Sequence, residues 1–541
     1  MYLTIGVTGH RDLLADEVPA LKDKVREFFL QLKSDFPGLD LQLITPLAEG
    51  SDRLVADVAL ELGIELIVPL PMGQADYEQD FSSSEAVEAF RETLKKARII
   101  HLRLLRKRPD TSLDHDEKSH QYAQMGIFIS NHSQVLLALW DGKPSSEVGG
   151  TASVVNYHLT AVMPGFSLAE DSPNLLADNE NDLVYHIVCS RNRPNGQPTE
   201  GLLPLQAIWL TAQFGLESGE QLPIEYKIMW ERLEDYGRDM AKYESAIREN
   251  GADLLENAPD IELPVGTQTI SEQHRIADWL AIHFQKRISL GLIAIHSIAV
   301  LIGLIFIIYS EFDGLDFLVN FFLLAFFAGF VLYKIGERRQ WHRKHLDYRA
   351  LAEGLRVQFY WSLAGVIDVQ SAEFAYDNFL QKQDVDLGWI RHVMRNVSLA
   401  RSRDNVPQAE WVDWVIEQWV GDEERQTGQL CYYRRKELEK ARRFRRTTYL
   451  GVITLWVGIL IAILLAVAGT KMADSHRHYL LVLMGILPLF AGVRDAYSHK
   501  KAEKELIKQY RFMRGILANA RRLLDGSDDL DFRRAVLRAL G

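Results

Sequence analysis

Four long apolar stretches lie in the second half of the chain, in two pairs that are each separated by a short turn. They are Ile288–Tyr309, Phe317–Tyr333, Tyr449–Thr470 and Tyr479–Val493. The first and third are long enough to cross a bilayer, which takes about 20 residues, and the shorter two can cross it with tilt or local thinning. The alternative is a soluble bundle, but core helices rarely run as long as Tyr449–Thr470 without a charge. The pattern therefore predicts two transmembrane hairpins.

Basic residues flank the outer ends of both hairpins, and the first turn carries acidic residues only. Because short basic flanks stay on the cytoplasmic side, both ends of the chain and its middle segment are expected in the cytoplasm, with the stem in the inner (cytoplasmic) membrane. The basic flanking residues are Lys286, Arg287, Lys334, Arg338, Arg339, Arg343, Lys344, Arg442, Arg443, Arg445, Arg446, Arg494, Lys500 and Lys501.

The first part of the chain alternates short apolar runs with amphipathic helical segments. This alternation predicts an α/β fold with a parallel sheet that carries helices on both faces. The expected strands are Leu3–Val7, Leu41–Ile44, Leu66–Pro69, Ile99–Leu102, Val135–Trp140 and Val184–Cys189.

At 541 residues the chain is too long for one core. We expect an α/β domain over 1–195, a mostly helical connector over 196–270, and a first two-helix transmembrane unit with a cytoplasmic helical extension over 271–370. A cytoplasmic helical segment over 371–430 and a second two-helix transmembrane unit with a C-terminal helix over 431–541 complete the chain.

A short repeat follows the two hairpins. The segments Asp347–Gln358 and Gln509–Ala520 both contain Tyr-Arg, then a glycine, then an apolar residue. The glycine follows the tyrosine at six residues in one copy and at five in the other. Two hairpins with similar exits suggest a duplicated two-helix unit.

Composition excludes some classes of function. A net charge of −12 argues against a general nucleic-acid binder. The two cysteines, Cys189 and Cys431, provide neither a disulfide framework nor a zinc ribbon. The opening MYLTIGVTGH lacks the pattern of a signal peptide, so the head is expected in the cytosol. His120, His158 and His186 form no metal-ligand spacing and are interpreted as surface or core histidines.

Three polar loops follow strands or open helices on the α/β part, where ligands bind in such folds. Their glycines let backbone amides approach an anion, and their cations suit the phosphates of a nucleotide, whereas Glu49 and Asp52 suit ribose hydroxyls or a base. The ordinary alternatives are turn glycines, a helix cap at Asp52 and a solvated Arg53, and no GxxxxGK[ST] is present. The candidate ligand-binding residues are Thr8, Gly9, His10, Arg11, Glu49, Gly50, Ser51, Asp52, Arg53, Asp141, Gly149, Gly150 and Thr151.

The blocks GVTGHRDL, PLAEGSDRLVADVALELGIELIVPLPM, HSQVLLALWDGKP and GGTASVV occur in this order within residues 1–190. This set resembles the SLOG superfamily, a Rossmann-like group of nucleotide-binding domains. The hairpins with their Tyr-Arg exits are similar to the SMODS- and SLOG-associating two-transmembrane effector family (SLATT). The resemblance implies a nucleotide-derived ligand in the head and an action on the membrane in prokaryotic conflict systems, including antiviral defence.

One departure concerns catalysis. The LOG-type hydrolases of the SLOG group carry a PGGxGTxxE pattern whose glutamate is catalytic, and the stretch Val148–Val155 contains no acid after its glycines. The sequence therefore does not support catalysis, and no catalytic residue, metal or certain cofactor is expected.

The preferred hypothesis is a membrane effector, a homo-oligomer whose head senses a nucleotide and whose hairpins form a pore or disturb the bilayer. The alternatives are a membrane-anchored nucleotide or nucleoside hydrolase and a constitutive membrane scaffold.

Overall fold

The computed structural model describes residues 1–105, 114–145, 147–163, 183–212, 217–256, 258–260, 262–264, 266–366, 387–399 and 409–541. The chain divides into two compact units. Unit 1 comprises Met1–Leu255, Ile261–Ile276 and Glu353–Pro407; unit 2 comprises Glu256–Asp260, Ala277–Ala352 and Gln408–Gly541. Part of the expected helical segment 371–430 lies outside the described residues.

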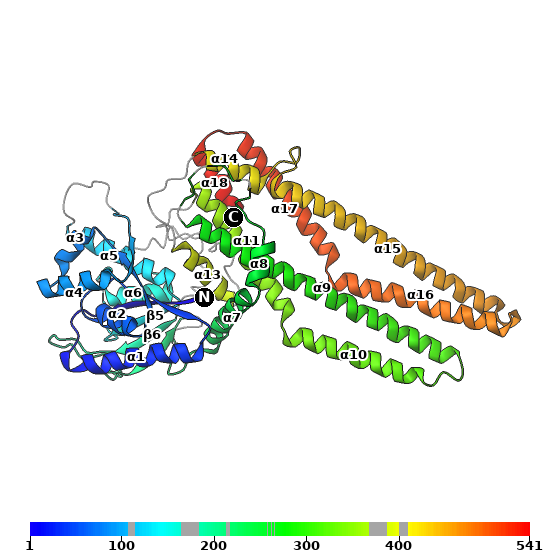
Figure 1. The fold of residues 1–541 in the computed structure, drawn as a ribbon, viewed down its shortest axis with the longest axis horizontal. Helices are drawn as coiled ribbons and strands as arrows, with labels where there is room; N and C mark the ends of the chain where they lie inside the picture. Colours follow the sequence, from blue (N-terminus) through cyan, green and yellow to red (C-terminus); the bar gives the residue numbers. More distant parts are fainter. Residues whose placement is uncertain are drawn as a thin grey trace. The chain divides into compact units, whose positions relative to one another are not determined.

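Unit 1 is built on a sheet of eight strands in the order β4-β3-β2-β1-β5-β6-β7-β8 (Figure 1). The first six strands along the chain run parallel, β7 is antiparallel to β6, and β8 is antiparallel to β7. The α/β fold with a parallel sheet is thus confirmed. The strands are β1 (Tyr2–Gly9), β2 (Asp40–Ile44), β3 (Glu65–Leu70), β4 (Arg98–His101), β5 (Val135–Trp140), β6 (Val184–Val188), β7 (Ala207–Thr211) and β8 (Glu217–Gly219).

Helices cover both faces of this sheet, which explains why β1 and β5 are almost wholly buried. The Cα–Cβ direction of Gly6 points at Ile129 of α5 and that of Gly9 at Ser51 of α2. Since residues three apart on a strand face opposite sides, α2 and α5 lie on opposite faces. The helices of this part are α1 (Val18–Asp35), α2 (Ser51–Glu61), α3 (Gln74–Tyr77), α4 (Ser84–Leu94), α5 (His115–His132), α6 (Thr151–Thr160), α7 (Ile224–Lys242) and α8 (Glu244–Asn250).

Two later parts of the chain join unit 1 in ways that the apolar pattern did not predict. The connector expected to be mostly helical contains β7 and β8, and Trp209 of β7 packs on Tyr185 with ring centroids 4.7 Å apart. Helix α13 (Gly388–Ser398) also belongs to unit 1. The Oδ1 atom of its Asn396 accepts hydrogen bonds from Thr4 Oγ1 (2.8 Å) and Gln42 Nε2 (2.6 Å), on the two central strands.

Unit 2 holds the apolar hairpins, and four helices there are long and apolar enough to cross a membrane. Helices α9 (Thr267–Glu311) and α10 (Leu318–Arg338) form the first hairpin, and α15 (Gly428–Ala468) and α16 (Asp474–Lys500) the second (Figure 1). Their apolar side chains are largely exposed, as expected of surfaces that meet lipid. The chain is therefore a multi-pass membrane protein. The remaining helices are α11 (Trp341–Ala364), α14 (Ala409–Val415), the π-helical turn Ile416–Val420, α17 (Glu503–Asp525) and α18 (Leu530–Leu540).

Small residues bring the two hairpins together. A Cβ atom added at Gly303 of α9 would lie 2.5 Å from Leu489 of α16, and one added at Gly485 of α16 would lie 3.1 Å from Ile307 of α9. Figure 1 accordingly shows α9 between α10 and α16. The ring of His296 packs edge-on against Tyr497 of α16 at 5.2 Å, and its Nδ1 lies 2.7 Å from the Leu292 carbonyl of its own helix. The four helices thus form one stem.

The exits of the hairpins are built alike. Each exit helix begins after a non-glycine residue with positive φ, Gln340 (φ 49) in the first copy and Ala502 (φ 46) in the second. Each of these residues stands eight positions before the tyrosine of the Tyr-Arg pair. The arginine of each pair binds an acid on the first helix of its own hairpin: Arg349–Asp278 and Arg511–Glu437 are both 2.8 Å apart. These shared features support a duplicated unit.

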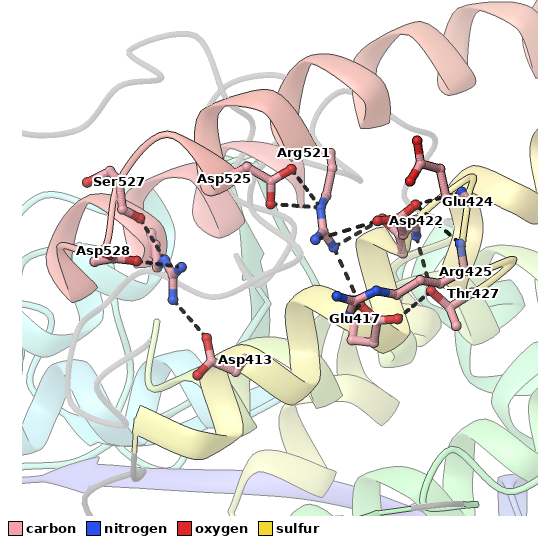
Figure 2. A network of polar contacts seen from close by, with 12 residues as sticks. Asp413, Glu417, Asp422, Glu424, Arg425, Thr427, Arg521, Asp525, Ser527 and Asp528 are labelled. Carbon is pink, nitrogen blue, oxygen red and sulfur yellow. Dashed lines mark hydrogen bonds and ion pairs between the residues drawn. The ribbon is translucent and has the colours of Figure 1, made fainter.

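Ion pairs tie α17 to the π-helical turn and the following loop, and α18 to α14 (Figure 2). Arg521 binds Asp525 (3.0 Å) and Glu417 (3.5 Å), and Arg533 binds Asp413 (2.8 Å). The C-terminal helices are thereby held on the segment that leads into α15.

Candidate functional site

The loops after β1 and β5 meet at the centre of the sheet. The chain passes from β1 outward through β2, β3 and β4, and β5 then returns to the other side of β1. Neighbouring strands whose connections leave in opposite directions define a topological switch point, and ligands bind at the carboxyl ends of such strands. His10 and Asp141 stand directly after these two strands.

Two of the expected loops lie against each other. The backbone N–H and the side-chain hydroxyl of Ser51 both donate to the His10 carbonyl, at 3.1 and 2.8 Å. Gly50 has a φ of 82°, and a Cβ atom at Gly9 would lie 2.4 Å from Ser51. The glycines at these two positions are therefore required by a close approach, and the loops after β1 and β2 form one surface.

The third loop, which carries Gly149, Gly150 and Thr151, reaches the same surface through α5. Gly149 has a φ of 77°, and a Cβ atom there would lie 2.7 Å from the backbone nitrogen of Ala123. The Arg11 guanidinium lies 5.7 Å from the ring centroid of the adjacent Tyr122. Gly150 and Thr151 begin α6, so its free backbone amides lie at the end of this loop.

His10 and Asp141 form a buried pair. The Asp141 backbone N–H donates to His10 Nε2 (3.2 Å), and Asp141 Oδ1 lies 3.1 Å from the same nitrogen. Burial lowers the pKa of His10, and the carboxylate of Asp141 opposes that shift. Asp141 is 1% exposed, and its Oδ2 has no hydrogen-bond partner in the described part of the chain.

Asp52 is a second buried acid with an unused oxygen. It is 6% exposed, and its Oδ1 has no partner among the residues that the structure describes. Burial raises its pKa to about 8, against the opposing effects of the Arg11 charge and the Ala48 amide. The carboxyl is therefore largely protonated at neutral pH. The ordinary alternative, a helix cap at Asp52, does not hold, because the N-cap of α2 is Gly50.

Arg53 keeps unused hydrogen-bond donors at the candidate site, whereas Glu49 is hydrogen-bonded to a neighbouring segment. The Arg53 guanidinium lies 5.3 Å from the Phe81 ring, while its Nε and one terminal nitrogen are buried without a partner in the described ranges. Glu49 accepts from the Ser82 N–H (3.0 Å) and hydroxyl (2.7 Å). Thr8 is buried near the end of β1, on the face toward α5 by strand alternation.

The structure adds side chains from the loop after β3 and from α5. Tyr77 donates to the Pro46 carbonyl (3.1 Å), Tyr122 donates to Asp80, and Lys118 binds Asp80 at 2.6 Å. The segment after β3 could have been predicted as part of the site from the sequence, because it too follows a parallel strand. No pattern in the sequence indicated Tyr122, which reaches the site from the middle of a helix.

The histidines set aside in the sequence do not join the site. His158 is buried between Ser130 and the Leu183 carbonyl, His186 is buried against the Trp140 carbonyl, and His120 is exposed. Within the described residues, no group of three or more His, Cys, Asp or Glu side chains could hold a metal ion.

The candidate site thus combines two buried carboxyl groups with unused oxygens, an arginine with unused donors, and loops whose glycines allow close packing at one rim of the sheet. Such groups suit a polar ligand with both hydroxyl or amino donors and an anionic part. The chain is a multi-pass membrane protein whose first unit carries a Rossmann-like parallel sheet. No protein-family model matches it, and no curated protein or solved structure is significantly similar to it.

Proposed function

We propose that this protein is a ligand-gated membrane effector. Its α/β unit binds a nucleotide or a nucleotide-derived signal, and the hairpins respond by forming a pore or by perturbing the bilayer. The observation that carries the proposal is the convergence of the three loops at one rim, where Asp52, Asp141 and Arg53 hold buried polar atoms without partners. Buried polar groups are normally satisfied, so a ligand is the expected source of the missing hydrogen bonds.

The resemblance to SLOG domains and SLATT hairpins supports the same interpretation and adds its context, a prokaryotic antiviral defence system. The charges around the hairpins support an orientation with the head, the middle segment and the C-terminal helices in the cytoplasm. One chain supplies four candidate spans, so a conducting path requires a homo-oligomer. A ligand can shift the stem only if it binds two states of the protein with different affinity.

A membrane-anchored hydrolase is the second candidate, favoured by one observation. Asp52 has its pKa raised to about 8 by burial, and a carboxyl that stays protonated at neutral pH can act as a general acid. Glu49, the other acid of that loop, is engaged by Ser82. Product analysis separates the candidates, because an effector returns its ligand intact and a hydrolase returns a cleaved one.

The proposal is tested with the purified full-length chain, by calorimetry against a panel of nucleotides and by dye release from liposomes. We expect one nucleotide class to bind and to trigger release. Arg53→Gln should weaken that binding about tenfold or more, because a charged hydrogen bond is worth about 1.5–3 kcal/mol. Arg26→Gln is the matched control, since Arg26 is an exposed arginine already paired with Glu61 at 2.6 Å.

Two results would contradict the effector proposal. One is that no nucleotide binds or changes dye release. The other is that a nucleotide is hydrolysed, with Asp52→Asn abolishing turnover and no ligand changing dye release.

A further inference from the structure

Basic residues gather at the open end of the second hairpin, opposite its turn. Residues 440–448 and 494–504 contain nine lysines and arginines and only two acids, Asp495 and Glu503. We call the nine residues the basic collar: Lys440, Arg442, Arg443, Arg445, Arg446, Arg494, Lys500, Lys501 and Lys504. The collar ends where the apolar part of α15 begins, at Tyr449.

Three helices bring the collar together around Phe444 of α15. Arg494 of α16 and Lys504 of α17 both lie 5.8 Å from the centroid of its ring. Arg494 is fixed there by hydrogen bonds to the hydroxyls of Thr447 (3.0 Å) and Thr448 (2.7 Å). The collar is therefore one surface formed by α15, α16 and α17.

The positive charges lie close enough to repel one another. Burial lowers the pKa of Lys440, and the charges of Lys501 and Arg443 lower it further. The two nearby acids offset only part of the charge of the nine collar residues. Glu503 accepts from the Ser498 hydroxyl (3.1 Å), and Asp495 lies 3.7 Å from Arg494.

Arginines farther from the apolar helices differ from those of the collar. Arg434 binds Glu423 (3.0 Å), Arg511 binds Glu437 (2.8 Å), and Arg521 binds Asp525 (3.0 Å; Figure 2). In contrast, the four collar arginines of α15 are exposed and have no acidic partner among the described residues: Arg442, Arg443, Arg445 and Arg446. Arg435 of α15 is also exposed and without an acidic partner among the described residues, so five arginines of α15 lack one, and four of these five stand within seven residues of Tyr449.

We infer that the basic collar is a binding site for the phosphate headgroups of anionic lipids. Guanidinium groups bind phosphate oxygens in pairs, and basic residues beside a transmembrane helix attract anionic lipids by about 1 kcal/mol each. The exposed apolar residues Tyr449 (68%) and Leu450 (63%) follow directly on α15. A lipid offers acyl chains to these residues as well as a phosphate to the collar, which a free anion does not.

The test measures lipid retention by the detergent-purified full-length chain with native mass spectrometry. Phosphatidylglycerol and phosphatidylcholine of equal chain length are added in competition. We expect the wild-type chain to prefer phosphatidylglycerol. The double variant Arg445→Gln/Arg446→Gln should reduce that preference about thirtyfold, the equivalent of about 1 kcal/mol for each lost charge. Raising the salt concentration should weaken the wild-type preference.

The matched control is Arg434→Gln/Arg435→Gln, which removes the same number of charges from the same helix about three turns farther from Tyr449. It should keep the wild-type preference. Three results would overturn the inference: equal retention of both lipids, an equal loss in the control variant, or displacement of phosphatidylglycerol by millimolar inorganic phosphate at constant ionic strength. If the collar variant does not fold, the salt series on the wild-type chain is the test, and a preference for phosphatidylglycerol that does not weaken at higher salt would overturn the inference.

Discussion

At the scale of single residues, the sequence indicated which loops meet at one rim of the sheet but not the state of their side chains. Strand-loop-helix order placed His10, Ser51 and Asp141 at one rim because parallel strands end on the same edge of a sheet. Burial and side-chain hydrogen bonds depend on the packing of distant segments. The unused oxygen of Asp52 and the hydrogen bond from Ser82 to Glu49 were therefore known only from the structure. The alternative explanation of Asp52 as a helix cap is excluded because Gly50 occupies the N-cap position.

The raised pKa of Asp52 predicts a specific dependence of stability on pH. The ordinary pKa of the Asp52 carboxyl is 3.8, and its pKa in the folded chain is about 8. Between these two pH values, Asp52 holds a proton in the folded chain that it has lost in the unfolded chain. The contribution of Asp52 to stability therefore falls as pH rises through this window. Asp52→Asn removes the effect, so the variant should gain in Tm relative to the wild type from pH 5 to pH 8.5. Thermal unfolding in detergent, followed by tryptophan fluorescence, measures the difference. Parallel Tm curves would contradict the assigned pKa.

We expect that no other residue can replace Gly149 without a loss of stability, because of both its positive φ and its close contact with α5. Gly149→Ala places a methyl group 2.7 Å from the Ala123 nitrogen in a left-handed backbone conformation. Gly63→Ala is the control, because Gly63 has a φ of 68° and nothing within 4 Å of an added Cβ. We expect Gly63→Ala to cost about 1 kcal/mol and Gly149→Ala about 1–3 kcal/mol more, as measured by denaturant unfolding. Equal costs would show that the backbone of α5 does not confine this loop.

At the scale of elements, long periodic or apolar segments were predicted well and short ones were not. The transmembrane helices and the six parallel strands have strong patterns over their whole length. Strands β7 and β8 contain five and three residues, and β8 reads ESG, which has no apolar pattern. The pairing of β7 with β6, and of β8 with β7, depends on the strand edge that each neighbour offers, which local sequence does not encode.

The repeated ion pair at the hairpin exits predicts that a charge reversal lowers stability and that a second reversal on the partner residue restores it. Arg511→Glu sets two acids side by side at the 2.8 Å contact with Glu437, and we expect it to lower stability by about 1 kcal/mol or more, because Glu437 is buried. Adding Glu437→Arg restores opposite charges and should recover most of the loss in a double-mutant cycle. The same cycle at Arg349 and Asp278 should give the same sign if the units are duplicates. Additive effects would show that the pair is not coupled.

At the scale of the whole molecule, unit 1 is assembled from segments that lie on both sides of the first hairpin in sequence. The sequence alone suggested a head complete by residue 195, because hydrophobic periodicity reports local elements and not long-range partners. The hydrogen bonds of Asn396 to Thr4 and Gln42 connect α13 with the centre of the sheet.

Loss of that connection should weaken unit 1 in the full-length chain. Asn396→Ala leaves the Thr4 hydroxyl and the Gln42 amide short of an acceptor, and we expect a loss of about 1–3 kcal/mol. Asn250→Ala, which changes an exposed helix end, should have little effect. Hydrogen exchange of β1 and β2 localises the change, and unaltered exchange in these strands would contradict the role of α13.

The place of α13 in the sequence has a consequence for biogenesis. The ribosome makes residues 388–398 only after it has made α9 and α10, so the nascent sheet lacks its last partner while the first hairpin is being delivered to the translocation machinery. Completion of unit 1 is thereby placed after commitment of the first hairpin to the lipid phase. A cell that makes this polypeptide would accordingly hold few completed α/β units that are not already attached to a membrane.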